Sequence, residues 1–253
     1  MIEISLITWN INGIRSLLDV NSITNKLDII KRINPTYLLL QETRTGKVEL
    51  IQQLANILNY KHYYYLISKK TNNAGVAILT NDSDSIITYD DLILPEEGRI
   101  LILESKEYVI INLYSPYIGI KNINFDKREK WESYIIELIK SYNHTNVIVC
   151  GDLNVAPESI DRDNVDSSKQ AGCSEKESEM FYNLLAKTSL IDPYRLLNND
   201  NGFTWGLYHS KLRLDYILIS EKLKCTLIKV IKLNDINIKP LSDHYPLYAS
   251  IQI

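Results

Sequence analysis

One stretch of the chain decides its fold: Val147-Ile148-Val149-Cys150-Gly151-Asp152-Leu153-Asn154-Val155-Ala156-Pro157. The β-branched run predicts a buried strand that ends in polar residues and breaks at Pro157. Asp152 and Asn154 are two positions apart, so on an extended chain their side chains point the same way. A carboxylate beside an amide can bind a hard metal ion through oxygen, or position a water molecule. An Asx turn, in which both side chains satisfy only backbone groups, is the competing interpretation.

Length and composition indicate a globular protein. The 253 residues are 45% hydrophobic and 23% charged, which is enough for a sizeable core. Because we find no repeat, low-complexity tract or linker, we expect a single domain over residues 1–253. The net charge of −3 is close to neutral, so any nucleic acid must be held by a local basic patch or a bound metal.

The cysteines and the N-terminus predict an intracellular protein. Cys150, Cys173 and Cys225 are odd in number and widely spaced, which fits neither a disulfide framework nor a zinc site. The N-terminus lacks a signal-peptide pattern, and no apolar run is long enough to span a bilayer. We therefore expect no membrane partner, and a nuclear location in a eukaryote or a cytoplasmic one otherwise.

Two other predicted strands also end in oxygen-bearing residues. The alternating run Ile2–Trp9 is followed by Asn10 and Asn12, which are again two positions apart. The wholly apolar run Tyr37–Leu40, which predicts a strand buried on both faces, is followed by Glu42. Three strands thus deliver polar side chains at their ends.

The remaining pattern alternates strands with long amphipathic helices. We expect helices at 21–33 (capped by Asn21-Ser22), 47–58, 123–142 and 175–187, the last opened by a capping box of Ser174 and Glu177. Strands are expected near 61–68, 75–81, 84–89, 99–105, 108–114, 147–152, 212–219 and 224–233, with a final strand after Pro246. Two strand-rich halves with helices outside predict an α/β fold of two packed sheets between helical layers.

Polar residues at strand ends form the candidate site, because strand ends on one edge of a sandwich converge on a cleft. They are Asn10, Asn12, Glu42, Tyr114, Asp152, Asn154, Asp215, Asp243 and His244. No His/Cys cluster suggests zinc, and no Gly-rich loop suggests a nucleotide. Carboxylate and amide oxygens with one histidine suit Mg²⁺-assisted attack on a phosphate ester.

Six motifs in order, spread over nearly the whole chain, resemble the exonuclease III family of apurinic/apyrimidinic (AP) endonucleases. They are Trp9–Arg15 (WNINGIR), Leu40–Arg44 (LQETR), Tyr114–Pro116 (YSP), Gly151–Glu158 (GDLNVAPE), Arg213–Tyr216 (RLDY) and Ser242–His244 (SDH). The resemblance implies a four-layered α/β sandwich with two mostly antiparallel sheets. It also implies hydrolysis of the DNA phosphodiester 5′ to an abasic site, and 3′-exonuclease and 3′-phosphatase activity beside it.

Each site residue takes a role from the resemblance. Glu42 would be the principal Mg²⁺ ligand, and Mn²⁺ can substitute for Mg²⁺. Asp152 would activate the attacking water or donate a proton, and Asn154 would orient that water. The resemblance implies a metal set of Asn10, Glu42, Asp152, Asn154, Asp243 and His244, and a catalytic set of Tyr114, Asp152, Asn154, Asp215 and His244. Tyr114 would hold the phosphate, and Asp215 would fix the tautomer of His244, which contacts the phosphate or acts as base.

The implied partner is double-stranded DNA with abasic sites, bound by a monomer. The implied DNA contacts are Asn12, Arg15, Arg44, Asn164 and Trp205. The chain departs from the family pattern at Tyr117 and in a short Gly206–Leu212 loop, where Leu212 replaces an aromatic pocket wall.

Two other functions compete with this interpretation. One is a superfamily nuclease of other specificity, such as a retrotransposon-type endonuclease, for which the short loop is suitable. The other is a non-catalytic DNA-binding relative, which should have lost some catalytic residues; none is missing here.

Overall fold

The computed structural model describes residues 2–18, 23–70, 72–83, 85–90, 92–119, 123–142, 145–166, 170–207, 209–233 and 241–253. The predicted cap at Asn21-Ser22 lies outside these residues. Within them, no helix combines the length and apolar character needed to cross a membrane.

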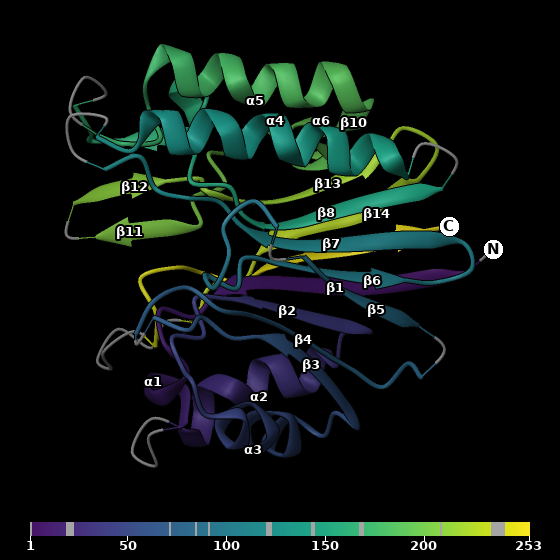
Figure 1. Ribbon diagram of the computed structural model, residues 1–253. Helices are drawn as coiled ribbons and strands as arrows, with labels where there is room; N and C mark the ends of the chain where they lie inside the picture. The colour runs from purple at the N-terminus through teal and green to yellow at the C-terminus, as the bar shows by residue number, and fades with distance from the viewer. Residues whose placement is uncertain are drawn as a thin grey trace.

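Two six-stranded sheets form the centre of the molecule (Figure 1). The first contains, in spatial order, β14 (Lys224–Val230), β15 (Leu247–Gln252), β1 (Glu3–Asn10), β2 (Tyr37–Gln41), β4 (Val76–Thr80) and β3 (His62–Leu66). The second contains β10 (Leu190–Ile191), β13 (Asp215–Ser220), β8 (Asn146–Asp152), β7 (Tyr108–Tyr114), β6 (Ile100–Glu104) and β5 (Ile86–Asp90). Only β1 with β2 and β7 with β8 pair in parallel among these strands.

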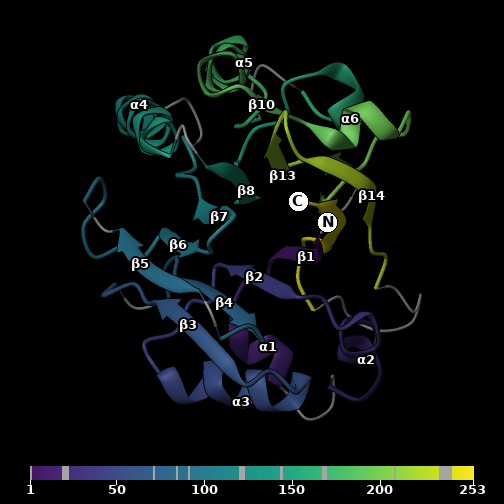
Figure 2. The ribbon, with the colours of Figure 1, turned by 90° about the vertical axis from the view of Figure 1, so that its right-hand side faces the viewer.

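Helices cover the outer face of each sheet. The first sheet carries α1 (Ile14–Leu18), α2 (Ile23–Ile33) and α3 (Val48–Leu58), and the second carries α4 (Phe125–Ser141) and α5 (Glu175–Thr188). Figure 2 shows the same four layers from the end that carries the termini. The predicted α/β sandwich of two mostly antiparallel sheets between helices is confirmed.

The predicted capping box opens α5. The Ser174 hydroxyl accepts a bond from the Glu177 backbone N–H at 3.3 Å, and the Glu177 carboxylate accepts one from the Ser174 N–H at 3.1 Å. These two bonds satisfy backbone donors that the first turn of a helix otherwise leaves unpaired.

The main core lies between the two sheets and explains why the central strands are apolar on both faces. Leu39 and Ile78 of the first sheet meet Ile110 and Ile148 of the second in one buried cluster. By contrast, the Tyr63–Tyr65 run on β3 is partly buried, as predicted for a half-buried strand.

A third, small sheet lies at the end of the sandwich opposite the termini (Figure 1). It contains β11 (Trp205–Leu207), β12 (Ser210–Leu212) and β9 (Arg162–Asp163), which follows the 3₁₀ helix η2 (Ser159–Asp161). The hairpin of β11 and β12 is the short loop seen in the sequence, and Trp205 pairs across it with Leu212. The short helix α6 (Pro193–Leu197) lies between β9 and β11 in the chain.

Strand register aligns the chain segments that carry the polar residues. Asp152 lies opposite Tyr114 of β7 and opposite Asp215 of β13. Gly151 permits this alignment: its φ is +140°, and an added Cβ would lie 1.8 Å from the Leu113 carbonyl oxygen. Any larger residue there would push β7 away from β8 directly beside Asp152.

Candidate active site

The two sheets meet at the side chain of Asn10, the last residue of β1. Its amide nitrogen donates to Glu42 Oε1 and to Asp152 Oδ2, each at 2.8 Å. Its oxygen accepts the Asn12 backbone N–H at 3.0 Å, which fixes the amide with its nitrogen toward the carboxylates. The predicted site residues Glu42 and Asp152 therefore lie within twice a hydrogen-bond length of each other.

Asp152 combines both interpretations of the opening stretch. Its Oδ1 accepts the Asn154 backbone N–H at 2.8 Å, as in an Asx turn, while Oδ2 accepts the Asn10 amide. Asn154 has φ +50°, so the chain is not extended here and the expectation that both side chains point the same way was wrong. The turn sends the Asn154 amide to the Ser115 carbonyl at 2.9 Å.

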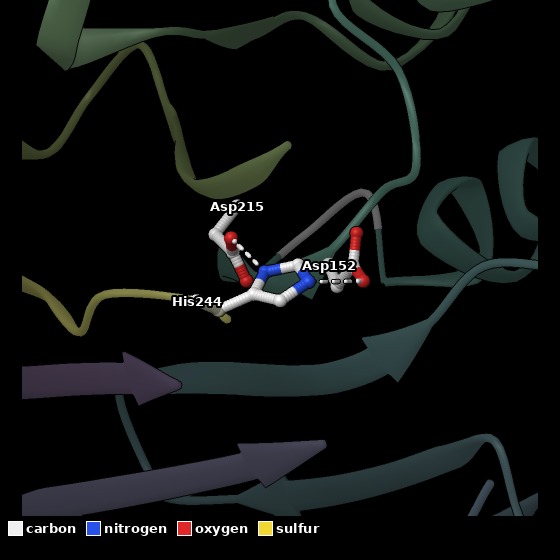
Figure 3. Close-up of side chains that lie close together, drawn as sticks. All are labelled: Asp152, Asp215 and His244. Carbon is white, nitrogen blue, oxygen red and sulfur yellow. Dashed lines mark hydrogen bonds and ion pairs between the residues drawn. The ribbon is translucent and has the colours of Figure 1, made fainter. Parts of the chain in front are cut away.

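His244 lies between two buried carboxylates (Figure 3). Its Nδ1 is 2.7 Å from Asp215 Oδ2, and its Nε2 is 3.9 Å from Asp152 Oδ2. Burial lowers the pKa of His244, but the bonded Asp215 carboxylate, with Asp152 and Asp243 nearby, raises it to about 10. In the ligand-free protein the imidazole is therefore a cation held by Asp215.

Asp152 is poised close to neutral pH. Burial raises the pKa of Asp152 to about 7, although the His244 cation opposes the rise and Asp215 adds to it. A carboxylate with such a pKa can exchange a proton with water in either direction near neutrality.

Asp243 connects the site to the small sheet. Its two oxygens accept the Asn12 amide N–H at 2.8 Å and the Trp205 indole N–H at 3.0 Å. Burial raises the pKa of Asp243, but His244 and these two hydrogen bonds outweigh it and lower the pKa below its usual value. Trp205 is partly buried and packs against the small buried cluster that contains Leu212 and Leu214.

Tyr114 faces the same carboxylates from the end of β7. Removal from water, followed by the charges of Glu42 and Asp152, raises the pKa of its hydroxyl well above the usual value. The hydroxyl therefore stays protonated and can donate a hydrogen bond, with the Glu42 carboxylate as its neighbouring acceptor. Arg99 stacks over the Tyr114 ring, with its guanidinium carbon 4.5 Å from the ring centroid.

The predicted DNA contacts lie around this cluster and not in it. The Arg44 guanidinium contacts Glu42 at the rim of the cleft and stays 40% exposed. Arg15 is exposed and reaches Asn72 at 3.5 Å, and the exposed Asn164 follows β9 of the small sheet. Leu212, expected as the second pocket wall, is fully buried beneath the hairpin, so that expectation was wrong.

The donor set fits a divalent cation. Ligand atoms of Asp152, Asp215 and His244 lie within 4.8 Å of one another, and Asp215 Oδ1 is buried with no hydrogen-bond partner among the described residues. However, a protonated His244 cannot act as a ligand. The Glu42 and Asp152 carboxylate oxygens, which both accept from Asn10, are hard ligands. They fit Mg²⁺ better than the group that includes the His244 nitrogen.

The comparison with a family model decides the assignment. The model, described as the endonuclease/exonuclease/phosphatase family, matches residues 7–244. The chain belongs to the endonuclease/exonuclease/phosphatase family. All the catalytic residues expected from the sequence lie within that span.

The individual relatives that resemble this chain are named as nucleases. An exodeoxyribonuclease of Bacillus subtilis is 30% identical over 242 residues, covering 87% of this chain and 89% of the relative. A DNA-(apurinic or apyrimidinic site) endonuclease of Dictyostelium discoideum is 29% identical over 266 residues, covering 99% and 71%. An AP endonuclease structure from Archaeoglobus fulgidus has a TM-score of 0.78 at 25% identity, covering 97% and 98%. The resemblance and the enzyme class predicted from the sequence are confirmed.

Three supporting residues of this endonuclease/exonuclease/phosphatase site were missed in the sequence analysis. The Thr204 hydroxyl accepts the Asp215 backbone N–H at 3.0 Å, and the Ser242 hydroxyl accepts the His244 N–H at 3.1 Å. Ser242 belongs to the Ser242–His244 motif and Thr204 directly precedes Trp205, so the sequence held a usable signal for both. Arg99 has no local signal, because its stacking on Tyr114 joins residues from different strands.

Proposed function

We propose that this protein is a Mg²⁺-dependent AP endonuclease that hydrolyses the phosphodiester 5′ to an abasic site in duplex DNA and acts as a monomer. The observation that carries the proposal is the array Asp215–His244–Asp152, which Asn10 joins to Glu42 through hydrogen bonds to both carboxylates. The array places a cationic donor next to a carboxylate that titrates near neutral pH. This combination suits attack of water on a phosphate ester.

His244 and Tyr114 bind the scissile phosphate. Asp215 holds Nδ1 of the imidazole, so Nε2 is the atom that donates to a phosphate oxygen. The Tyr114 hydroxyl, protonated at all physiological pH values, is the second donor. Both donors are fixed before substrate arrives, which favours the more negative transition state.

Asp152 moves the proton. Its Oδ2 takes the proton of the attacking water, while Oδ1 stays bonded to the Asn154 N–H and keeps the carboxylate in place. Asn154, next to it, orients that water. Accepting the proton at a group with pKa about 7 requires no strong base at neutral pH.

Glu42 would be the principal ligand of Mg²⁺, with Asn10, Asp152, Asn154, Asp243 and His244 around it. A cation held there would supply neutralisation of phosphate charge and stabilisation of the leaving oxygen. Asn10 contributes by donating to both carboxylates, which brings their oxygens together. Arg44, in contact with Glu42, shifts to DNA phosphate when substrate binds.

DNA binds along the face that carries Asn12, Arg15, Arg44, Asn164 and Trp205. Because the net charge is −3, affinity comes from these local contacts and falls with salt. The Trp205 ring lines the abasic pocket, with its N–H on Asp243. Leu212 is fully buried and offers no wall to this pocket, so we infer that the pocket is more open on that side, which favours a second activity, 3′→5′ trimming of undamaged duplex.

The test is a duplex with one abasic-site analogue, incubated with Mg²⁺ or with excess EDTA. The expected product is one cut that leaves a 3′-hydroxyl, with none in EDTA. An undamaged duplex of the same sequence is the control and should lose only 3′-terminal nucleotides. Trimming without abasic incision would make the second activity the main one, and undiminished incision in EDTA would overturn the metal assignment.

A further inference from the structure

Arg128 on α4 is a buried arginine that is separated in sequence from the site residues Tyr114 and Asp152. Its side chain is 2% exposed, and Nε donates to Glu132 Oε1 at 2.6 Å one helical turn later. Its two remaining nitrogens form hydrogen bonds outside the helix. Nη1 donates to the Pro116 carbonyl at 3.0 Å, and Nη2 donates to the Leu153 carbonyl at 2.6 Å.

Those two carbonyls belong to the loops that carry the catalytic groups. Pro116 is two residues after Tyr114, and Leu153 stands between Asp152 and Asn154. The planar guanidinium fixes the direction of both bonds at once, which the flexible ammonium of a lysine cannot do. One side chain therefore sets the separation of the two loops.

Neighbouring bonds complete the connection. The Trp131 indole donates to the Ser115 hydroxyl at 3.0 Å, and the Ser115 backbone N–H donates to the Asp152 carbonyl at 2.9 Å. Burial of the Arg128–Glu132 pair costs desolvation free energy that an apolar pair would avoid. Packing of α4 therefore does not explain the arginine, whereas its contact with both loops does.

We propose that Arg128 is a positioning residue that holds Tyr114 and Asp152 at their working separation. The inference rests on the proposed function for its kinetic readout only. Displacement of a reacting group by about 1 Å costs on the order of a hundredfold in rate. Loss of the two Arg128 bonds to the Pro116 and Leu153 carbonyls should therefore lower kcat and leave KM nearly unchanged, because the DNA contacts lie elsewhere.

The main test replaces the pair together, Arg128→Met with Glu132→Leu, so that no charge is left buried alone. Such exchanges are often neutral or stabilising, so the double variant should keep a Tm close to that of the wild type. Its kcat on the abasic duplex should fall about 10- to 100-fold, with KM within about threefold. The exposed pair Lys140→Gln with Glu137→Gln on the same helix is the matched control and should change neither value.

Hydrogen–deuterium exchange gives a readout that does not depend on activity. Amides in 114–117 and 152–155 should exchange about tenfold faster in the double variant, and α4 itself should be unchanged. Arg128→Lys is the second variant and should recover only part of the kcat loss. A folded double variant with wild-type kcat and unchanged exchange would overturn the proposal. Inactive wild-type protein would refute the proposed function, whereas the exchange result would still decide the role of Arg128.

Discussion

The two halves of the sandwich hold their site loops in different ways. In the first half, the loops after β1 and β2 are tied by backbone bonds: the Gly13 N–H donates to the Glu42 carbonyl at 2.8 Å, and the Ile14 N–H donates to the Thr43 carbonyl at 3.0 Å. In the second half, one backbone bond, from the Ser115 N–H to the Asp152 carbonyl at 2.9 Å, joins the loops after β7 and β8, and side chains reaching from outside tie each loop as well. Arg128 is one of these, and the Tyr216 hydroxyl, which donates to the Val155 carbonyl at 2.8 Å, is another.

The difference determines which substitutions matter in each half. Backbone bonds survive most side-chain changes, and only positions with special backbone geometry are sensitive. Gly75 is one, with φ +87° and an added Cβ 2.4 Å from the Thr43 hydroxyl. The second half instead depends on residues such as Arg128 that are distant from the site in sequence.

The largest loss of incision rate is expected from a change at Asp152, where the two sheets meet. Asp152→Asn removes the proton acceptor but keeps the side-chain volume and the bond to the Asn154 N–H. Incision should fall by about 10²- to 10⁴-fold, while binding to abasic duplex and Tm change little. Single-turnover rates and a binding titration measure both quantities. Asp126→Asn, on the exposed start of α4, is the control. Near-wild-type cutting by the Asp152→Asn variant would show that Asp152 takes no part in the mechanism.

A change in the first half should act through the metal. Glu42→Gln weakens the main Mg²⁺ ligand, so the Mg²⁺ concentration for half-maximal rate should rise about 10- to 100-fold or more. Activity should partly return at high Mg²⁺. An unaltered metal titration would show that Glu42 is not a ligand. Glu129→Gln, exposed on α4, serves as the control.

The difference between the two halves predicts smaller effects on the free energy of unfolding, and these effects should be unequal. Trp131→Phe leaves the buried Ser115 hydroxyl without its donor and should destabilise the protein by about 1–3 kcal/mol. Ser16→Ala removes a hydroxyl that donates to the Gly13 carbonyl at 2.7 Å, but the backbone bonds of that loop remain. Its cost should stay within about 0.5 kcal/mol. Denaturant unfolding measures both, and equal losses would contradict the difference between the halves.

Much of the fold could be predicted from local pattern. The strand at 108–114 and the capping box of α5 agree with the structure because alternation and caps depend only on near neighbours. Strand order could not be predicted, since β14 reaches the edge of the first sheet through long-range pairing.

Site residues such as Asn10, Glu42 and Asp152 could be predicted from their position at the ends of strands, whereas Asp215 begins β13, and Asp243 and His244 precede β15. The orientation of the side chains could not be predicted. The positive φ of Asn154 turns its side chain to Ser115, and sequence spacing alone does not reveal this turn. Leu212 was expected at the pocket, but strand pairing in the small sheet buries it. Arg128 and its buried partner Glu132 lie among exposed charged residues such as Glu129 and Lys130, so nothing local marks Arg128 as buried.

The most direct test of a single composite site is the cycle of Glu42→Gln, Asp152→Asn and the double variant. Because Asn10 joins both carboxylates and both serve one reaction, the single losses should not multiply. In single-turnover incision of the abasic duplex at fixed Mg²⁺, the double variant should be no more than about threefold slower than Asp152→Asn alone. Losses that multiply in full would mean that the two halves act independently.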